Sequence, residues 1–413
     1  MEIKDTLNLP ETDFPMKASL TKAEPKMLEW WAKEKIYEEI RESSKGKKKF
    51  VFHDGPPYAN GHIHMGHALN KILKDFIVKI MGMKGYDAGF IPGWDCHGLP
   101  IEHQVGKKLK EKKMSLEKSA IRNQCRSYAQ DFVSIQRDEF KRLGIFADWD
   151  NPYLTMDYSY EATIVREFGK FVEKGMVYKG LKPVHWCTSC RTALAEAEVE
   201  HADHTSPSIY VKFEIKSGVP NSMGGLGKAY MVIWTTTPWT LPANLAISLH
   251  PEFQYVAVAI NDEVLIVAEE RLSSLILEWD VNEYKVLGVC KGKEWETAIC
   301  QHPFINRDSK VILGDHVTLE QGTGCVHTAP GHGQDDYIVG LKYGLEPYNP
   351  VDDGGVFRND VEHFSGMFVR KANPEIIEKL NQDGFLIHKE DIKHSYPHCW
   401  RCHQPVIFRA TNQ

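Results

Sequence analysis

The first part of the chain is patterned mainly for helices. Between residues 64 and 81, apolar side chains return every three or four positions, which predicts an amphipathic helix. An apolar run at 49–53 precedes it and predicts a short buried strand. The other elements predicted in this part are a helix over 24–41 in an N-terminal extension, a strand over 86–91, and charge-rich helices over 101–143 and 160–175.

The pattern changes near Tyr178. From Ser208 to about Val326, short runs of β-branched and aromatic residues alternate with glycine and proline, which predicts a barrel-like β domain. A last run, at 405–410, predicts one more strand. The clearest strand runs of the β domain are 210–213, 231–234, 255–259 and 264–267.

Composition limits the class of protein. The 413 residues are 42% apolar and 26% charged, which is typical of a soluble globular protein with two or three domains. No apolar run approaches the roughly 18 residues that span a bilayer, and the N-terminus lacks the layout of a signal peptide. We therefore expect a cytoplasmic protein with no membrane partner.

The net charge of −6 gives no global basic field that would attract nucleic acid. Lysine-rich runs at 45–49 and 107–113 are local candidates for such a contact. A solvated protein face is the simpler explanation of each run, because most charge runs have that role.

The stretch from Gly55 to Asn70 lies where the first strand gives way to the helix. Open α/β folds bind nucleotides at such an edge, and the first helical turn offers free N–H groups and a positive dipole end to phosphate. His64 and His67 share one helix face and can donate to the same phosphate chain, while Gly66 lets a flat ring approach the backbone. A short HxGH match alone would more often be an ordinary helix start.

The whole segment GPPYANGHIHMGHALN resembles the HIGH motif of class I aminoacyl-tRNA synthetases, in the form found in the isoleucine-specific enzymes. The run GWDCHGLPIE at 93–102 strengthens the isoleucine assignment, and the resemblance extends from about residue 7 to residue 413. It implies an α/β fold, in which a Rossmann-like parallel sheet is interrupted by an inserted β-barrel-like editing domain.

The resemblance also implies a reaction. ATP with Mg²⁺ activates isoleucine for transfer to tRNA(Ile), and the full-length parent is expected to be monomeric. His64 and His67 would stabilise the phosphates of ATP, in chemistry that depends on positioning and charge stabilisation. Asp95, which is otherwise a plausible turn residue, would pair with the ammonium of the amino acid. The implied ATP-binding residues are Pro57, Asn60, His64, Gly66 and His67, and the implied amino-acid-binding residues are Gly55, Pro56 and Asp95.

Two CxxC motifs, Cys187 with Cys190 and Cys399 with Cys402, bracket the β region. Four thiolates from two such motifs can form a tetrahedral structural zinc site. The motifs lie much farther apart than in a compact zinc ribbon, so the site would act as a clasp at the neck of an inserted domain. A disulfide is disfavoured in a cytosolic protein, and motifs that hold no metal are the alternative. The five other cysteines show no matching spacing.

Two further motifs lie between the CxxC pairs. The run 234–244 delivers three successive threonines and then two prolines, and the glycine-rich run 322–337 adds an imidazole and adjacent carboxylates. Taken singly, they are an exposed strand and a loop. Together they resemble the editing domain of isoleucyl-, valyl- and leucyl-tRNA synthetases, which hydrolyses wrongly charged tRNA.

By that resemblance, Thr235, Thr236, Thr237 and Asn244 line the editing site. His327 would contact the ribose at the tRNA end, and Asp336 would hold the α-ammonium of the misattached amino acid. A carboxylate suits the latter role because a buried ammonium needs a paired charge. No metal triad or serine nucleophile is evident, so we expect attack by water that is aided by the substrate's own hydroxyl group.

The second ATP motif of the family, KMSKS, is absent. Lys113-Met114-Ser115 is similar but precedes the insertion, and we interpret it as a helix start with Ser115 as a possible cap. We therefore expect a fragment in which activation is incomplete; the alternatives are a free-standing aminoacyl-tRNA deacylase and a zinc-clasped tRNA-binding module without catalysis. The expected domains are an N-terminal extension (1–47), the first half of the catalytic domain (48–185), a zinc neck (186–200 and 390–404), the editing domain (201–389) and the start of the second half (405–413).

Overall fold

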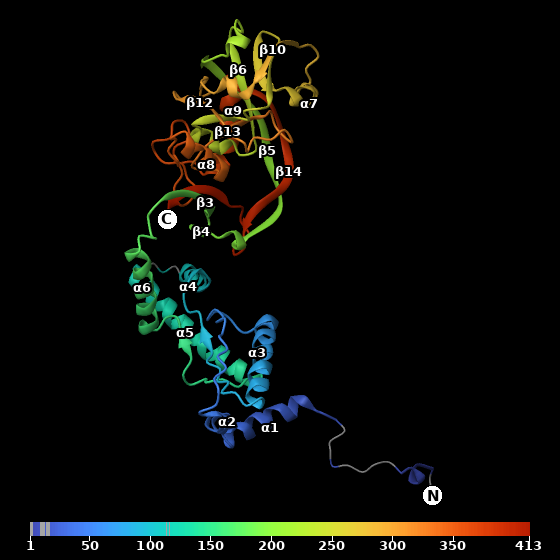
Figure 1. Ribbon diagram of the computed structural model, residues 1–413, viewed down its shortest axis with the longest axis vertical. Helices are drawn as coiled ribbons and strands as arrows, with labels where there is room; N and C mark the ends of the chain where they lie inside the picture. The colour runs from blue at the N-terminus through green and yellow to red at the C-terminus, as the bar shows by residue number, and fades with distance from the viewer. Residues whose placement is uncertain (1–2, 9–12, 14–16, 113, 115) are drawn as a thin grey trace. The chain divides into compact units, whose positions relative to one another are not determined.

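The computed structural model describes residues 3–8, 13, 17–112, 114 and 116–413 (Figure 1). The chain divides into two compact units, residues 1–177 and residues 178–413. The boundary coincides with the change from helical to β patterning at Tyr178. Within the described residues, no helix is long and apolar enough to cross a membrane.

Helices dominate the first unit. The predicted helix over 24–41 is in fact two helices, α1 (Leu20–Lys33) and α2 (Ile36–Ser44). They separate at Lys35, whose left-handed backbone (φ 53°) cannot continue a right-handed helix. The other helical elements of this unit are η1 (Ile3–Thr6), α3 (Met65–Met83), α4 (Leu99–Glu111), α5 (Lys118–Arg142) and α6 (Tyr158–Glu173).

The helices predicted over 64–81 and 160–175 are present as α3 and α6, whereas the helical stretch predicted over 101–143 forms two helices, α4 and α5. The cap that was expected at Ser115 lies outside the described residues, and α5 begins after Glu117. Helix α3 turns Lys71, Asp75 and Val78 inward and leaves apolar side chains on its opposite face exposed. That exposed face includes Leu69, Leu73, Phe76, Ile77 and Ile80.

Parallel extended segments form the centre of the first unit. Strand β1 (Gly93–Trp94) pairs in parallel with β2 (Tyr153–Leu154). The segment before α3 joins the same arrangement through isolated parallel bridges from Lys49 to Asp87 and from Tyr58 to Asp95. This arrangement is the parallel α/β core that the sequence predicts.

The predicted strands over 49–53 and 86–91 were wrong in extent, since these segments meet at a bridge and not in a continuous ladder. Asp54 follows the first of these segments. Its carboxylate accepts a hydrogen bond from the backbone N–H of Gly93 at 3.1 Å, in place of a backbone carbonyl. The prolines that follow, Pro56 and Pro57, have no N–H to contribute to a ladder.

The second unit contains the β barrel. Its strands follow the order β10-β8-β9-β6-β13-β7-β12-β11-β5-β14, and an additional pairing of β6 with β5 closes a barrel from β6 round to β5. The predicted barrel-like domain is therefore confirmed. The strands of the sheet are β5 (Val199–Ser217), β6 (Ala229–Thr235), β7 (Ala246–Leu249), β8 (Gln254–Ile260), β9 (Glu263–Ala268), β10 (Lys285–Lys291), β11 (Ile299–Gln301), β12 (Asp308–Leu313), β13 (Cys325–Thr328) and β14 (Leu386–Cys399).

Apolar side chains fill both faces of this sheet. The barrel interior contains Phe213, Met231 and Trp295, and a second cluster around Val256 and Leu265 packs on the outside. Burial of this kind is the main stabilising term of the unit. The helical elements that cover the barrel are η3 (Asn221–Met223), η4 (Pro238–Ala243), η5 (Glu269–Arg271), α7 (Leu272–Glu278), η6 (Gly292–Trp295), α8 (Gln334–Lys342) and α9 (Val369–Gln382).

Strands β5 and β14 continue beyond the barrel as a long antiparallel ribbon (Figure 1). The ribbon leads to a small sheet in which β3 (Leu181–Cys187) lies between β4 (Thr192–Leu194) and β15 (Ile407–Asn412). The strand predicted over 405–410 is thus present as β15. Its pairing with β3 brings the two ends of this unit together.

Candidate functional site

The HIGH segment begins helix α3. His64 is the N-cap residue, and its Nδ1 accepts a hydrogen bond from the Gly66 N–H at 3.0 Å. In return, the His64 N–H donates to Nδ1 of His67 at 3.3 Å, and the two rings stack with their centroids 3.9 Å apart. With Nδ1 of each ring acting as an acceptor, each Nε2 carries the proton and can donate away from the helix.

The electrostatics around His67 favour its neutral ring. Burial and the neighbouring His64 lower the pKa of His67 from its ordinary value. A neutral imidazole can donate a hydrogen bond to a phosphate oxygen but brings no full positive charge. Gly66 is essential to the arrangement, because a Cβ at this position would lie 2.9 Å from Cε1 of His64.

The approach loop is held by backbone hydrogen bonds to the second extended segment. Pro57 O accepts from the Asp95 N–H and the Ala59 N–H donates to Asp95 O, both at 2.8 Å. Asn60 accepts a hydrogen bond from the Tyr128 hydroxyl, also at 2.8 Å. The predicted ATP and amino-acid residues therefore lie on two neighbouring segments of one unit.

Asp95 itself is half-buried. Its carboxylate accepts from the His97 N–H at 3.3 Å and from the Thr155 hydroxyl at 3.4 Å. These two contacts fix the side chain without neutralising it, and no ion pair to Asp95 is formed by the described residues. The carboxylate remains available to a cation.

A second site lies in the barrel unit. A cavity of about 440 Å³ is bounded by the threonine run after β6 and by the glycine-rich loop that contains β13. It brings together predicted residues that are almost 100 positions apart in the sequence. Of the predicted editing residues, those that line the cavity are Thr235, Thr236, Thr237, His327 and Asp336.

Asn244 was expected from the sequence to line this cavity, but it does not. Its side chain is fully buried and lies behind His327, where Nδ2 donates to Nδ1 of His327 at 2.8 Å and to Ala246 O at 2.9 Å. The Nε2–H of His327 then donates to the Thr240 hydroxyl at 3.0 Å. Burial lowers the pKa of His327 to about 3, so this ring is neutral.

Asp336 stands at the start of α8 and accepts a hydrogen bond from the Ala329 N–H at 2.9 Å. Burial raises the pKa of this carboxyl to about 6. Because burial makes the ionised carboxylate unfavourable, a bound cation would stabilise it strongly. The cavity can thus hold an ammonium at one end and hydroxyl groups at the other.

Sequence reasoning missed other members of this cavity. Thr240 is bonded to His327, and it stands in the same motif as the predicted threonines. His332 lines the cavity, donates from Nδ1 to Phe408 O at 2.9 Å, and has its pKa lowered to about 4 by burial. The glycine-rich run contained that histidine, but nothing in its spacing singled it out.

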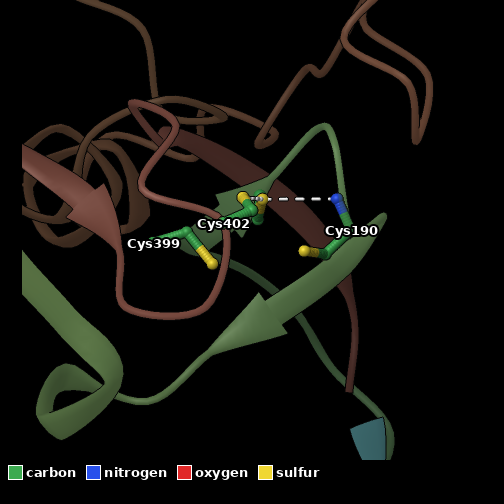
Figure 2. Close-up of side chains that lie close together, drawn as sticks. Cys190, Cys399 and Cys402 are labelled. Atoms are coloured by element: carbon green, nitrogen blue, oxygen red, sulfur yellow. Dashed lines mark hydrogen bonds between the residues drawn. The ribbon is translucent and has the colours of Figure 1, made fainter. Parts of the chain in front are cut away.

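The four cysteines of the CxxC motifs meet at the end of the ribbon. Their sulfur atoms all lie within 4.8 Å of one another, and Figure 2 shows Cys190, Cys399 and Cys402 gathered in this way. The Cys190 N–H donates to Sγ of Cys187 at 3.3 Å (Figure 2), and all nine cysteines of the chain are free thiols. Burial raises the pKa of the Cys187 thiol to about 11.

This donor set fits a tetrahedral thiolate metal centre. Zn–S bonds of about 2.3 Å place the sulfur atoms about 3.8 Å apart, which small movements of these four residues would achieve. A dication would also reverse the raised pKa of the Cys187 thiol, since it stabilises the thiolate form.

Comparison with known proteins identifies the chain. The family model "tRNA synthetases class I (I, L, M and V)" matches residues 26–413. The chain belongs to this family of class I tRNA synthetases. The family resemblance predicted from the HIGH motif is confirmed, as is the α/β fold with its inserted barrel.

The curated relatives of this class I synthetase chain are isoleucine–tRNA ligases. Those of Syntrophotalea carbinolica and Geobacter sulfurreducens are each 55% identical to it over 415 residues, covering 100% of the chain and 45% of the relative. The chain thus spans less than half the length of these relatives. A solved structure described as "GlLeuRS-CP1" is 19% identical, covering 44% of the chain and 98% of that structure, with a TM-score of 0.38, which is too low to bear on this chain.

Proposed function

We propose that the chain is part of an isoleucine–tRNA ligase, which uses ATP to activate isoleucine for transfer to tRNA(Ile), and that it hydrolyses valine from mischarged tRNA(Ile). Support comes from the family membership, from relatives named isoleucine–tRNA ligase, and from two separate sites of different chemistry in one chain. The observation that carries the editing part is the cavity in which Asp336 and the threonine run face one space.

In the activation site, His64 and His67 donate from their Nε2 atoms to the phosphates of ATP. The backbone around Gly55 and Pro56 receives the amino acid, and Asp95 pairs with its ammonium. The loop residues Pro57 and Asn60 position the nucleotide, and Mg²⁺ enters with ATP and neutralises phosphate charge. These roles require fixed donors and charges, which the hydrogen bonds of the approach loop supply.

In the editing cavity, Asp336 binds the α-ammonium of the misattached valine. The hydroxyls of Thr235, Thr236 and Thr237 bind the ester and the attacking water. Both nitrogens of His327 are already bonded, so a ribose hydroxyl contacts this ring only by replacing Thr240 at Nε2. His327 and Asn244 therefore act first by positioning Thr240.

The editing proposal is tested by incubating the chain with valyl-tRNA(Ile) and measuring the release of valine. Hydrolysis by the unmodified chain, lost at least 100-fold in Asp336→Ala, is the expected result. Asp335 lines the same cavity on the neighbouring position and provides a matched control, because Asp335→Ala removes a carboxylate that makes no hydrogen bond to Ala329. Equal loss in both variants would contradict the role given to Asp336.

We also propose that the four cysteines hold a structural zinc ion at the neck between 186–200 and 390–404. The zinc would cross-link β3 to the end of β14, and its contribution is to folding and not to either reaction. The inserted domain, 201–389, would then be joined to the rest of the chain through this clasped neck. Location in the cytoplasm, where thiols stay reduced, agrees with nine free cysteines.

A further inference from the structure

A buried ion cluster lies beneath the amino-acid segment. The Asp54 side chain has no exposed area and accepts hydrogen bonds from Nζ of Lys71, from Nζ of Lys74 at 2.7 Å and from the Gly93 N–H. Within the described part of the chain, Asp54 is the carboxylate that forms an ion pair with these two lysines. Two ammonium groups therefore share one carboxylate, and the cluster has an excess of positive charge.

The two lysines differ in how their charge is stabilised. Lys71 is 3% exposed and lies over two aromatic rings, at 5.5 Å from the centroid of Phe90 and 5.4 Å from that of Phe140. Such cation–π contacts favour the ammonium form and, with Asp54, oppose the lowering of the Lys71 pKa that burial causes. Lys74 has no aromatic partner of this kind among the described residues, and 13% of its side chain is exposed. The charge that lacks compensation is therefore that of Lys74.

The position of Lys74 points to a ligand. Its Nζ lies 3.9 Å from the place that a Cβ on Gly55 would occupy, so the ammonium borders the backbone of Gly55. The neighbouring His67 is held neutral, as described above, and provides a hydrogen-bond donor without full charge. A buried cation without an anion of its own lowers the stability of the protein, unless a bound anion pairs with it. Each substrate of the proposed activation reaction carries an anionic group, the carboxylate of isoleucine and the phosphates of ATP.

We propose that Lys74 binds an anionic oxygen of the substrates beside Gly55, either the carboxylate of isoleucine or the α-phosphate of ATP. Asp54 and Lys71 hold the ammonium of Lys74 in place, and Lys74 is the binding residue. This inference rests on the proposed activation function of the chain. An ammonium fits both ligands, because it forms charge-assisted hydrogen bonds with carboxylate and phosphate alike.

The test compares four ligands by calorimetric titration of the whole chain. Isoleucine and isoleucinol differ in the carboxylate, and ATP and adenosine differ in the phosphates. The Lys74→Met variant is expected to bind isoleucine or ATP about tenfold more weakly, as for the loss of a charge-assisted contact, with the affinity for isoleucinol and adenosine unchanged within about twofold. The Lys74→Arg variant, which keeps the charge, should retain most of the affinity.

Lys79 on the same helix is the matched control. Its Nζ pairs with Asp75 at 2.5 Å in a one-to-one ion pair. The Lys79→Met variant should lower the midpoint of urea unfolding and leave all four affinities unchanged. By contrast, Lys74→Met leaves Asp54 paired with Lys71, so its midpoint should stay the same or rise.

Two outcomes would overturn the inference alone: unchanged affinity of Lys74→Met for both isoleucine and ATP, or an equal loss for the ligands with and without the anionic group. A marked fall in the unfolding midpoint of Lys74→Met would also overturn it, because that result assigns the lysine a structural role. If the unmodified chain binds none of the four ligands, the proposed activation function fails and this inference fails with it.

Discussion

The side-chain amide of Asn244 donates a hydrogen bond to Nδ1 of His327 at 2.8 Å. This contact fixes the tautomer of the imidazole, because Nδ1 must be the acceptor and Nε2 must carry the proton. The Nε2–H then donates to Thr240, whose hydroxyl donates to Thr237 O at 2.8 Å. A fully buried amide thus determines the direction of the hydrogen bonds that run from His327 through Thr240 to Thr237 O.

Replacing Asn244 by alanine should therefore affect both stability and editing. The change leaves Nδ1 of His327 without a partner in a buried position, and we expect a loss of about 1–3 kcal/mol in the free energy of unfolding. Urea denaturation measures this loss, and valyl-tRNA(Ile) hydrolysis should fall with it. Asn381→Ala, at an exposed position near the end of α9, is the control and should change stability by less than about 0.5 kcal/mol.

Editing should depend on the protonation of Asp336. Burial raises the pKa of this carboxyl to about 6, and only the ionised form pairs with an ammonium. The value of kcat/KM for valyl-tRNA(Ile) hydrolysis is expected to rise with pH through about 6. Asp336→Asn should be weak at every pH and should not show this rise. If the unmodified chain and Asp336→Asn gave pH profiles of the same shape, the role assigned to Asp336 would be contradicted.

The same shift predicts a pH-dependent stability. Because the native pKa of Asp336 is above its ordinary value of about 3.9, the native state binds the proton more tightly than the unfolded state does. The stability contributed by this group is greatest at low pH and falls as pH rises from about 4 to about 6. Asp336→Asn should thus be more stable than the unmodified chain at pH 7, by about 1–2 kcal/mol, and should lose this advantage near pH 4.

A methyl group at Gly66 should disturb the HIGH pair selectively. The Cβ of Gly66→Ala would lie 2.9 Å from Cε1 of His64, so the ring must move and its stacking with His67 is lost. We expect ATP binding to weaken by about tenfold, as for one lost charge-assisted hydrogen bond, with the helix content by circular dichroism unchanged. Gly82, on the same helix with open space at its Cβ position, provides the control variant Gly82→Ala.

Metal content can be measured directly. We expect close to one zinc per chain by elemental analysis, and a fall of several degrees in the thermal midpoint when a chelator removes it. Cys399→Ser should reduce the zinc content and lower the midpoint similarly. Cys125→Ser removes a half-buried thiol outside the cluster and should change neither quantity. A zinc content far below one per chain would remove the metal from the proposal.

The sequence predicted the elements with strong periodicity and the order of the two units. Apolar spacing placed α3 within two residues of its observed bounds, and β-branched runs identified β5, β6, β8 and β9. The break between α1 and α2 was not predictable, because Lys35 has ordinary helix propensity and gives no sign of its left-handed backbone. Tertiary context imposed that conformation.

The sites were predictable where a motif is contiguous. HIGH residues and the CxxC pairs were found because their spacing along the chain reflects one helical turn or one tight loop. The position of Asn244 behind His327 could not be predicted, because it depends on how β7 and β13 pair across the barrel. The cluster of Asp54 with Lys71 and Lys74 was also missed, because ion pairs between a loop and a helix leave no pattern in the sequence.

The pairing of β3 with β15 joins Leu181 to Asn412 and Trp186 to Ile407. The strand by which the chain enters the barrel unit and the last strand, β15, therefore lie side by side in one hydrogen-bonded pair. Such a unit can be inserted into another protein. The accepting protein needs only two adjacent attachment points, and the inserted barrel should keep its own fold. The same geometry makes the unit from Tyr178 onward a natural target for separate expression and crystallisation.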